Sequence, residues 1–172
     1  MKERALRRPF LFVSSFQKPL MDSLVLALDR ALSTLSGVAR GKRPAPTVKT
    51  AERTPPSEMV DNLPETERAR AVGLMRVNHA GEVAAQALYQ GQALTSRSIE
   101  LKAKLAHAAD EELDHLVWTR ERVRDLGGRT SVLDPIWYAG AFTIGAVAGL
   151  AGDRVSLGFL KATEEQVEAH LA

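Results

Sequence analysis

The sequence Glu112-Leu-Asp-His115 places an acid and an imidazole where a packed helix normally buries leucine. The residues around it recur at alternating steps of four and three, the spacing of the inward face of a bundle helix. They are Leu101, Leu105, Ala108, Glu112, His115, Thr119, Arg122 and Leu126. Burying an acid and an imidazole there without partners costs on the order of several kcal/mol. We therefore predict that a metal ion pairs with them, the alternative being a chance Glu-x-x-His on a helix surface.

Two further carboxylates take comparable positions on other predicted helices. Glu82 shares a face with Met75, Asn78, Ala85 and Tyr89. Glu164 shares one with Leu157, Leu160, Val167 and Leu171. The alternative for each is an ordinary exposed glutamate. We apply that interpretation to the acids that lie off these faces, Glu111, Asp114, Glu165 and Glu168.

The order of these groups matches most of a di-iron bundle. Such bundles take one Glu from each of two helices and Glu-x-x-His from each of the other two. Here Glu82, Glu112 with His115, and Glu164 follow one another in that order. Glu112 follows Glu82 by 112 − 82 = 30 residues, so a second Glu-x-x-His is expected about 30 residues after Glu164. The sequence ends at Ala172 without it, which leads us to expect a truncated chain.

Composition narrows the classes of protein that this chain can be. The net charge is only +2, and no basic block is interleaved with aromatic residues, so we expect no nucleic-acid binding. The absence of cysteine excludes disulfides, thiol catalysis and iron–sulfur clusters. Nothing alternates with the two-residue period of a strand for long, so the predicted fold class is all-α.

We divide the chain into three parts. Residues 1–20 are a basic upstream extension, and residues 21–60 hold an amphipathic helix followed by a proline-rich linker over 38–60. Asp22 is the expected cap of that helix and Gly37 its end. Residues 61–172 form the bundle. Its predicted helices run from Pro64 to Ala93, Ser98 to Leu126, Pro135 to Gly152, and Arg154 onward.

The third bundle helix is free of charge and rich in glycine and alanine from Pro135 to Gly152. Gly145-x-x-x-Gly149 is a pattern of close helix packing. Eighteen uncharged residues approach the length that spans a bilayer. Because large apolar side chains are few, we expect close packing inside the bundle rather than a membrane span.

Four consecutive blocks of the sequence resemble one known family. They are LMRVNHAGEVAAQALYQGQ, ADEELDHLVWTRERVRDLG, LDPIWYAGAFTIGAVAGLAGD and LGFLKATEEQVEAHL. They are similar to the 3-demethoxyubiquinol 3-hydroxylases, the di-iron hydroxylases of ubiquinone biosynthesis. The resemblance implies a ferritin-like four-helix bundle with an added N-terminal helix, of which the last bundle helix is missing here.

The resemblance also implies roles for individual residues. Glu82 would be a terminal ligand, and Glu112 a bridging ligand with His115 on the same iron. Glu164 would be the terminal carboxylate on the second iron, giving two ferrous ions per subunit. His170 aligns with a family histidine close to the site. From its place on the Glu82 face, Tyr89 could hydrogen-bond a ligand or substrate, or be an ordinary buried tyrosine.

The implied reaction uses dioxygen to hydroxylate a ring carbon of a polyprenylated benzoquinol, with electrons from a donor that the sequence does not identify. Because that substrate lives in a bilayer, we expect peripheral association with the cytoplasmic face of a bacterial cell membrane. Homo-oligomerisation is left open. Two alternatives stand beside this one: another ferritin-like di-iron oxidase, and a non-enzymatic lipid-binding or assembly subunit with a degenerate metal site.

Overall fold

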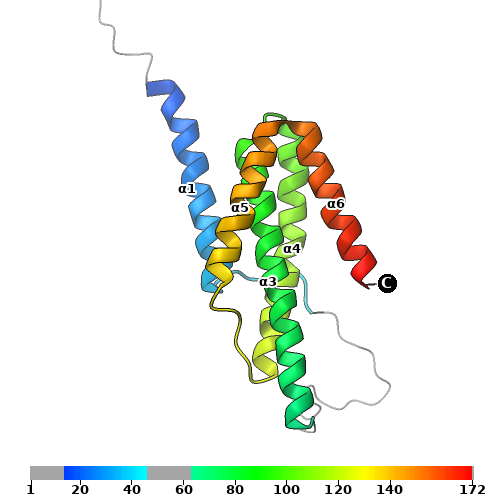
Figure 1. Ribbon diagram of the computed structural model, residues 1–172. Coiled ribbons are helices and arrows are strands. Elements are labelled where there is room, and N and C mark those ends of the chain that lie inside the picture. Colours follow the sequence, from blue (N-terminus) through cyan, green and yellow to red (C-terminus); the bar gives the residue numbers. More distant parts are fainter. Residues whose placement is uncertain (1–13, 46–62, 172) are drawn as a thin grey trace, which may run out of the picture.

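The computed structural model describes the backbone of residues 14–45 and 63–171, and the side chains of residues 21–45 and 63–165. Within these residues the chain forms five helices and no strand, which confirms the all-α prediction (Figure 1). The helices are α1 (Ser14–Ser36), α3 (Glu65–Thr95), α4 (Ile99–Asp125), α5 (Asp134–Ala151) and α6 (Asp153–Leu171). The predicted ends of the four bundle helices lie within two residues of these bounds.

Local signals explain where the helices stop and start. The Ser98 side chain accepts a hydrogen bond from the backbone N–H of Leu101 at 3.2 Å and so caps the start of α4. Gly152 separates α5 from α6 with a φ of +116°, a conformation that a residue with a side chain rarely adopts. The chain therefore reverses at Gly152, and α6 descends along the opposite side of the bundle from α5 (Figure 1).

Helix α3 is central, with α4 and α5 packed against it. The contact with α5 is backbone on backbone: a Cβ added to Gly91 would overlap the carbonyl of Phe142, and one added to Gly145 would overlap the carbonyl of Leu88. This confirms that the uncharged helix packs closely in the bundle. Across the described residues, no helix combines the length and apolarity needed to cross a membrane.

The N-terminal helix differs from the prediction at its start. It begins at Ser14, so Asp22 lies inside α1 and does not cap it. The prediction was wrong because a carboxylate within a helix looks the same in sequence as one at its start. The predicted end is confirmed, since Gly37 follows Ser36 with a φ of +78°. Residues 1–13 and 46–60 of the predicted extension and linker lie outside the described residues.

The inward face of α4 also differs from the predicted one. Leu101, Leu105 and Leu126 are buried as expected, but Arg122 is exposed and Val123 is buried in its place. The predicted positions repeat every 3.5 residues, whereas a straight helix turns every 3.6, so the buried stripe drifts along the helix. On the other predicted faces Asn78 and Leu157 are exposed, while Val167 and Leu171 have no described side chain.

Candidate metal centre

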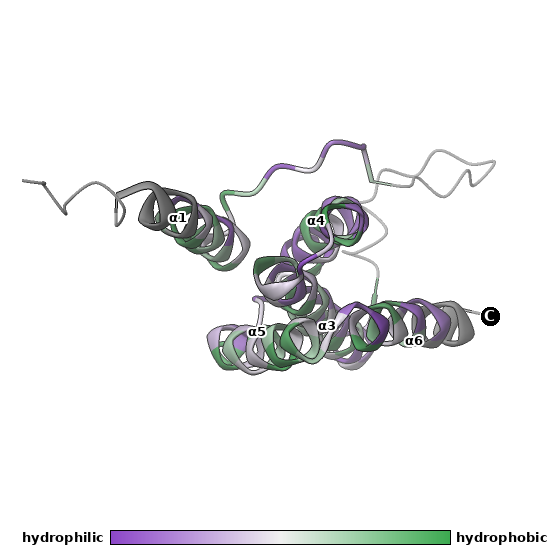
Figure 2. Cartoon of the chain, turned by 90° about the horizontal axis from the view of Figure 1, so that it is seen from above, coloured by the Kyte–Doolittle hydropathy of each residue, from purple (hydrophilic) through white to green (hydrophobic). Residues whose placement is uncertain are grey.

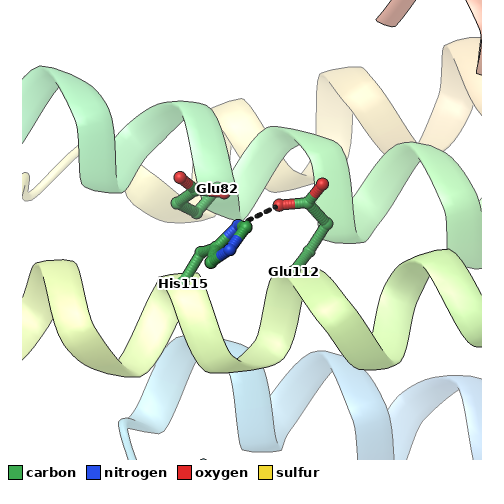
Figure 3. A group of neighbouring side chains, drawn as sticks. All are labelled: Glu82, Glu112 and His115. Carbon is green, nitrogen blue, oxygen red and sulfur yellow. Dashed lines mark hydrogen bonds and ion pairs between the residues drawn. The ribbon is translucent and has the colours of Figure 1, made fainter. Parts of the chain in front are cut away.

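Three of the four predicted metal-binding residues lie together between α3 and α4. Glu82 projects from α3 toward Glu112 and His115, which project from α4 (Figure 3). One potential ligand atom from each lies within 4.8 Å of the others. Glu112 and His115 are one turn apart, with Oε2 and Nδ1 separated by 3.3 Å. The described part of the chain offers no other such group of three acidic or histidine residues.

The two carboxylates destabilise one another when both are charged. Burial, together with a hydrogen bond to Glu112 and the charge of Glu112, raises the pKa of Glu82 to about 9. Without a cation, one proton is therefore shared at this position at neutral pH. The Glu112 side chain is only 17% exposed, so water screens this repulsion poorly.

A divalent metal ion fits this set of donors. Two carboxylates and one imidazole suit iron and other first-row divalent ions. A cation would replace the shared proton and neutralise the charge that burial makes unfavourable. Glu82, Glu112 and His115 can therefore hold one ion, and the His115 ring, whose side chain is 42% exposed, leaves an approach from solvent.

Glu164 is not part of the three-residue group. It lies on α6 and is exposed. The charge of Glu164 nevertheless acts on Tyr89, a buried residue of α3. Burial raises the pKa of Tyr89 above its ordinary range, and the charges of Glu112, Glu164 and Glu82 raise it as well. Tyr89 itself is 1% exposed, two turns after Glu82 on α3. The side chain of His170 lies outside the described residues.

A buried polar cluster lies behind His115. The Nδ1 atom of His79 is 3.1 Å from Oγ1 of Thr119, which donates to the carbonyl of His115 at 2.8 Å. Nε2 of His79 is 3.7 Å from the Asp134 carboxylate. Burial lowers the pKa of His79 to about 4, and the charge of Arg120 contributes, so its ring is neutral at pH 7. His79 is a core residue that joins α3, α4 and α5.

The sequence interpretation of Asp114 was wrong. It was assigned to the exposed surface, but it is 2% exposed because residues that follow α1 cover it. Arg43 donates to its carboxylate, and Trp118 donates to the Arg43 carbonyl. Sequence reasoning missed Arg43 and Trp118 as neighbours of the site. The available signal was the Gly41-Lys42-Arg43 run, whose charges complement the acids of α4.

Comparison with known proteins assigns the chain to a family. Residues 69–172 match the family model described as ubiquinone biosynthesis protein COQ7. The chain belongs to this family. Its all-helical architecture agrees with the ferritin-like bundle of the family, and no solved structure matches the chain significantly.

Curated relatives agree with the family match. A Burkholderia ambifaria (strain MC40-6) protein is 52% identical over 151 residues, which cover 88% of this chain and 69% of the relative. A Dechloromonas aromatica protein is 53% identical over 150 residues, 87% of this chain and 69% of the relative. A Ralstonia pickettii protein is 50% identical over 155 residues, 88% and 71% of the two chains. Each of the three is named 3-demethoxyubiquinol 3-hydroxylase.

Proposed function

We propose that this chain hydroxylates a ring carbon of a polyprenylated demethoxyubiquinol in ubiquinone biosynthesis. Family membership and the shared name of the relatives support a hydroxylase of this pathway. The observation that carries the proposal is the convergence of Glu82, Glu112 and His115 from two helices on one point. A hydroxylase that uses dioxygen needs a cofactor to activate it, and a metal ion held by carboxylates and an imidazole is one such cofactor.

Glu82, Glu112 and His115 would hold the first ferrous ion. When bound, iron would supply the activation of dioxygen, with the electrons coming from an external donor. Glu112 would also contribute to a second ion, which Glu164 would help to hold in a centre of two irons per subunit. In this chain that second position has Glu112 and Glu164 as its assigned ligands, so we expect it to bind iron more weakly than the first.

Tyr89 would act on the substrate side of the centre. Because burial and three neighbouring carboxylates raise its pKa, the Tyr89 hydroxyl keeps its proton at neutral pH. It can therefore donate a hydrogen bond to an oxygen of the quinol or of a ligand at the centre. The same burial limits the access of water to this side of α3.

We further propose that the chain associates peripherally with the cytoplasmic face of the cell membrane. Helix α1 stands to one side of the other helices (Figure 2), and its Val25, Leu28 and Leu32 side chains are each more than half exposed. Trp137 and Val147 of α5 are similarly exposed. Burying such side chains in a bilayer is favourable, and a polyprenyl quinol resides there.

The proposal is tested in cells that lack their own demethoxyubiquinol hydroxylase. Expression of the chain should restore hydroxylated ubiquinone, quantified by mass spectrometry of extracted quinones. Glu112→Gln should lower the product by at least about a hundredfold, because an amide keeps the shape of the side chain but not its charge. Glu111→Gln, on the adjacent exposed position, is the matched control and should leave the product unchanged.

Equal activity of the two variants would show that Glu112 is not part of the active centre. Failure of the unaltered chain to restore the product, while it is expressed and folded, would refute the proposed reaction for this chain.

A further inference from the structure

One buried acid of α4 holds a segment that lies far from it in the sequence. Asp114, 2% exposed, accepts hydrogen bonds from the backbone N–H of Lys42 at 2.5 Å and of Arg43 at 3.2 Å. The Arg43 side chain donates to the other carboxylate oxygen at 2.6 Å. Three N–H donors from Lys42 and Arg43 thus hold both oxygens of the Asp114 carboxylate.

The same segment fixes the ring of Trp118, one turn further along α4. The indole N–H of Trp118 donates to the Arg43 carbonyl at 3.1 Å. The Arg43 guanidinium lies over the indole, 5.9 Å from the ring centroid, a favourable cation–π geometry. Residues 42–43 thus contact Asp114 on one side and Trp118 on the other.

Trp118 in turn contacts the imidazole of the metal centre. The ring centroids of Trp118 and His115 are 5.3 Å apart and the planes are inclined at 49°. The His115 side chain is 42% exposed, so few other groups restrict the rotation of its ring. A Glu112 oxygen lies 3.3 Å from Nδ1 of His115, and the tilted indole of Trp118 is the aromatic neighbour of the imidazole.

We propose that Arg43 and Asp114 form a clasp that holds Trp118 against His115, so that Trp118 is a positioning residue for the metal-binding imidazole. This inference rests on the proposed metal centre. Partners that orient a metal-bound histidine are worth roughly 10- to 100-fold in metal affinity. Through the clasp, the position of residues 42–43 determines the orientation of the His115 ring toward a metal ion.

The chain provides a matched control for the clasp. Lys42 also pairs with Asp110 at 2.6 Å, and both side chains are more than half exposed. This pair joins the same two segments through the same kinds of charge, one turn before Asp114. If the clasp worked only by general attraction between the segments, Asp110→Asn and Asp114→Asn would have equal effects.

The first measurement is made on the metal-free full chain by NMR, with labelled histidine. The chain has four histidines, which makes the His115 ring protons assignable. A nuclear Overhauser effect between the His115 and Trp118 rings is expected in the unaltered protein and in Asp110→Asn. It should be lost or strongly weakened in Asp114→Asn. An effect that persists unchanged in Asp114→Asn would overturn the clasp.

The second measurement is titration with Co²⁺, followed by its visible absorption. Asp114→Asn and Trp118→Leu should each weaken binding by about tenfold, whereas Trp118→Phe, which retains a ring, should weaken it less. Circular dichroism establishes that each variant is folded. Binding by folded Trp118→Leu that equals the unaltered chain would overturn the positioning role. If the unaltered chain itself binds no Co²⁺, the proposed metal centre fails, while the NMR contact still decides whether the clasp exists.

Discussion

The two faces of α3 use opposite means to hold their neighbours. Toward α5, glycines allow the two backbones to touch, with Gly91 of α3 against Phe142 and Gly145 of α5 against Leu88. Toward α4, side chains make the contact: apolar ones such as Ala87 and Leu116, and the polar group that includes Glu82. A contact made by backbone atoms cannot adjust, whereas one made by side chains can take up a ligand.

The difference between the faces assigns them different tasks. The α3–α5 face supplies rigidity, because dispersion contacts between close backbones leave no gap for water. The α3–α4 face sacrifices stability, because burial and the neighbouring Glu112 make the ionised form of Glu82 unfavourable in the absence of a cation. The α3–α5 contact keeps α3 in place, although the buried carboxylates lower the stability of the α3–α4 contact.

The largest effect is expected from filling the backbone contact between α3 and α5. Gly145→Ala should destabilise the fold by about 3 kcal/mol, because the new methyl group meets the carbonyl of Leu88, which cannot move away. Gly140→Ala on the same helix is the control, since nothing lies within 4 Å of its added Cβ. It should be neutral or stabilise by up to about 1 kcal/mol. Urea unfolding measures both, and equal effects would contradict the proposed contact.

On the α4 side, removal of a charge should have opposite effects on stability and on metal binding. The folded pKa of Glu82 is raised above its ordinary 4.5, so its contribution to stability is fullest below pH 4.5 and is lost as pH rises toward 9. Glu82→Gln should therefore stabilise the metal-free chain at pH 8 by on the order of 1 kcal/mol. Co²⁺ affinity should fall by at least about a hundredfold, since even outer partners are worth 10- to 100-fold.

Thermal melting with and without Co²⁺ separates the two effects of Glu82→Gln. A metal-free variant that is less stable than the unaltered chain at pH 8 would mean that the ionised Glu82 carboxylate does not destabilise the fold.

A smaller effect on stability is expected from breaking a chain of hydrogen bonds that links α5 to α4 through α3. The Tyr138 hydroxyl of α5 donates to Gln90, whose amide donates to Gln86 at 2.9 Å, and Gln86 donates to the Ala109 carbonyl of α4. Tyr138→Phe should cost about 1–2 kcal/mol, because the Gln90 oxygen is buried. Thr143→Ala, which removes an exposed bond within α5, should cost less than about 0.5 kcal/mol. Chemical denaturation that ranks the two in reverse would remove Tyr138 from the network.

The smallest effect concerns acid stability where α3, α4 and α5 meet. The folded pKa of His79 is about 4 against an ordinary 6.5, so the unfolded chain binds a proton between these values and the folded chain does not. Stability is therefore retained above pH 6.5 and falls as pH drops toward 4; His79 alone would lower it by about 2 kcal/mol between pH 7 and pH 5, and the opposing titration of Asp134 reduces this change. Asp134 faces the ring, and Arg120 and Arg124 lie near it.

Burial raises the pKa of Asp134, so its titration changes stability with pH in the direction opposite to that of His79. The test therefore compares the pH dependence of the free energy of unfolding between the unaltered chain and His79→Asn. A variant with the same pH dependence as the unaltered chain would assign the acid sensitivity to another group.

The sequence by itself determined the four bundle helices and the three residues of the candidate metal centre. Helix ends depend on residues close together in the sequence, such as the cap at Ser98 and the positive φ at Gly152. Such local signals can be recognised from the sequence alone. The convergence of Glu82, Glu112 and His115 follows from the helical period, which places them on facing sides of two adjacent helices.

Only the tertiary structure decided which of the remaining polar residues are buried. Asp114 and Asp110 are one turn apart and chemically identical, yet one is 2% exposed and the other is more than half exposed. The difference comes from Arg43, which lies 71 residues from Asp114 in the chain. The helical period describes how a residue relates to its own helix, whereas burial by a distant segment depends on how that segment docks. The contacts of Trp118 were hidden from the sequence for the same reason.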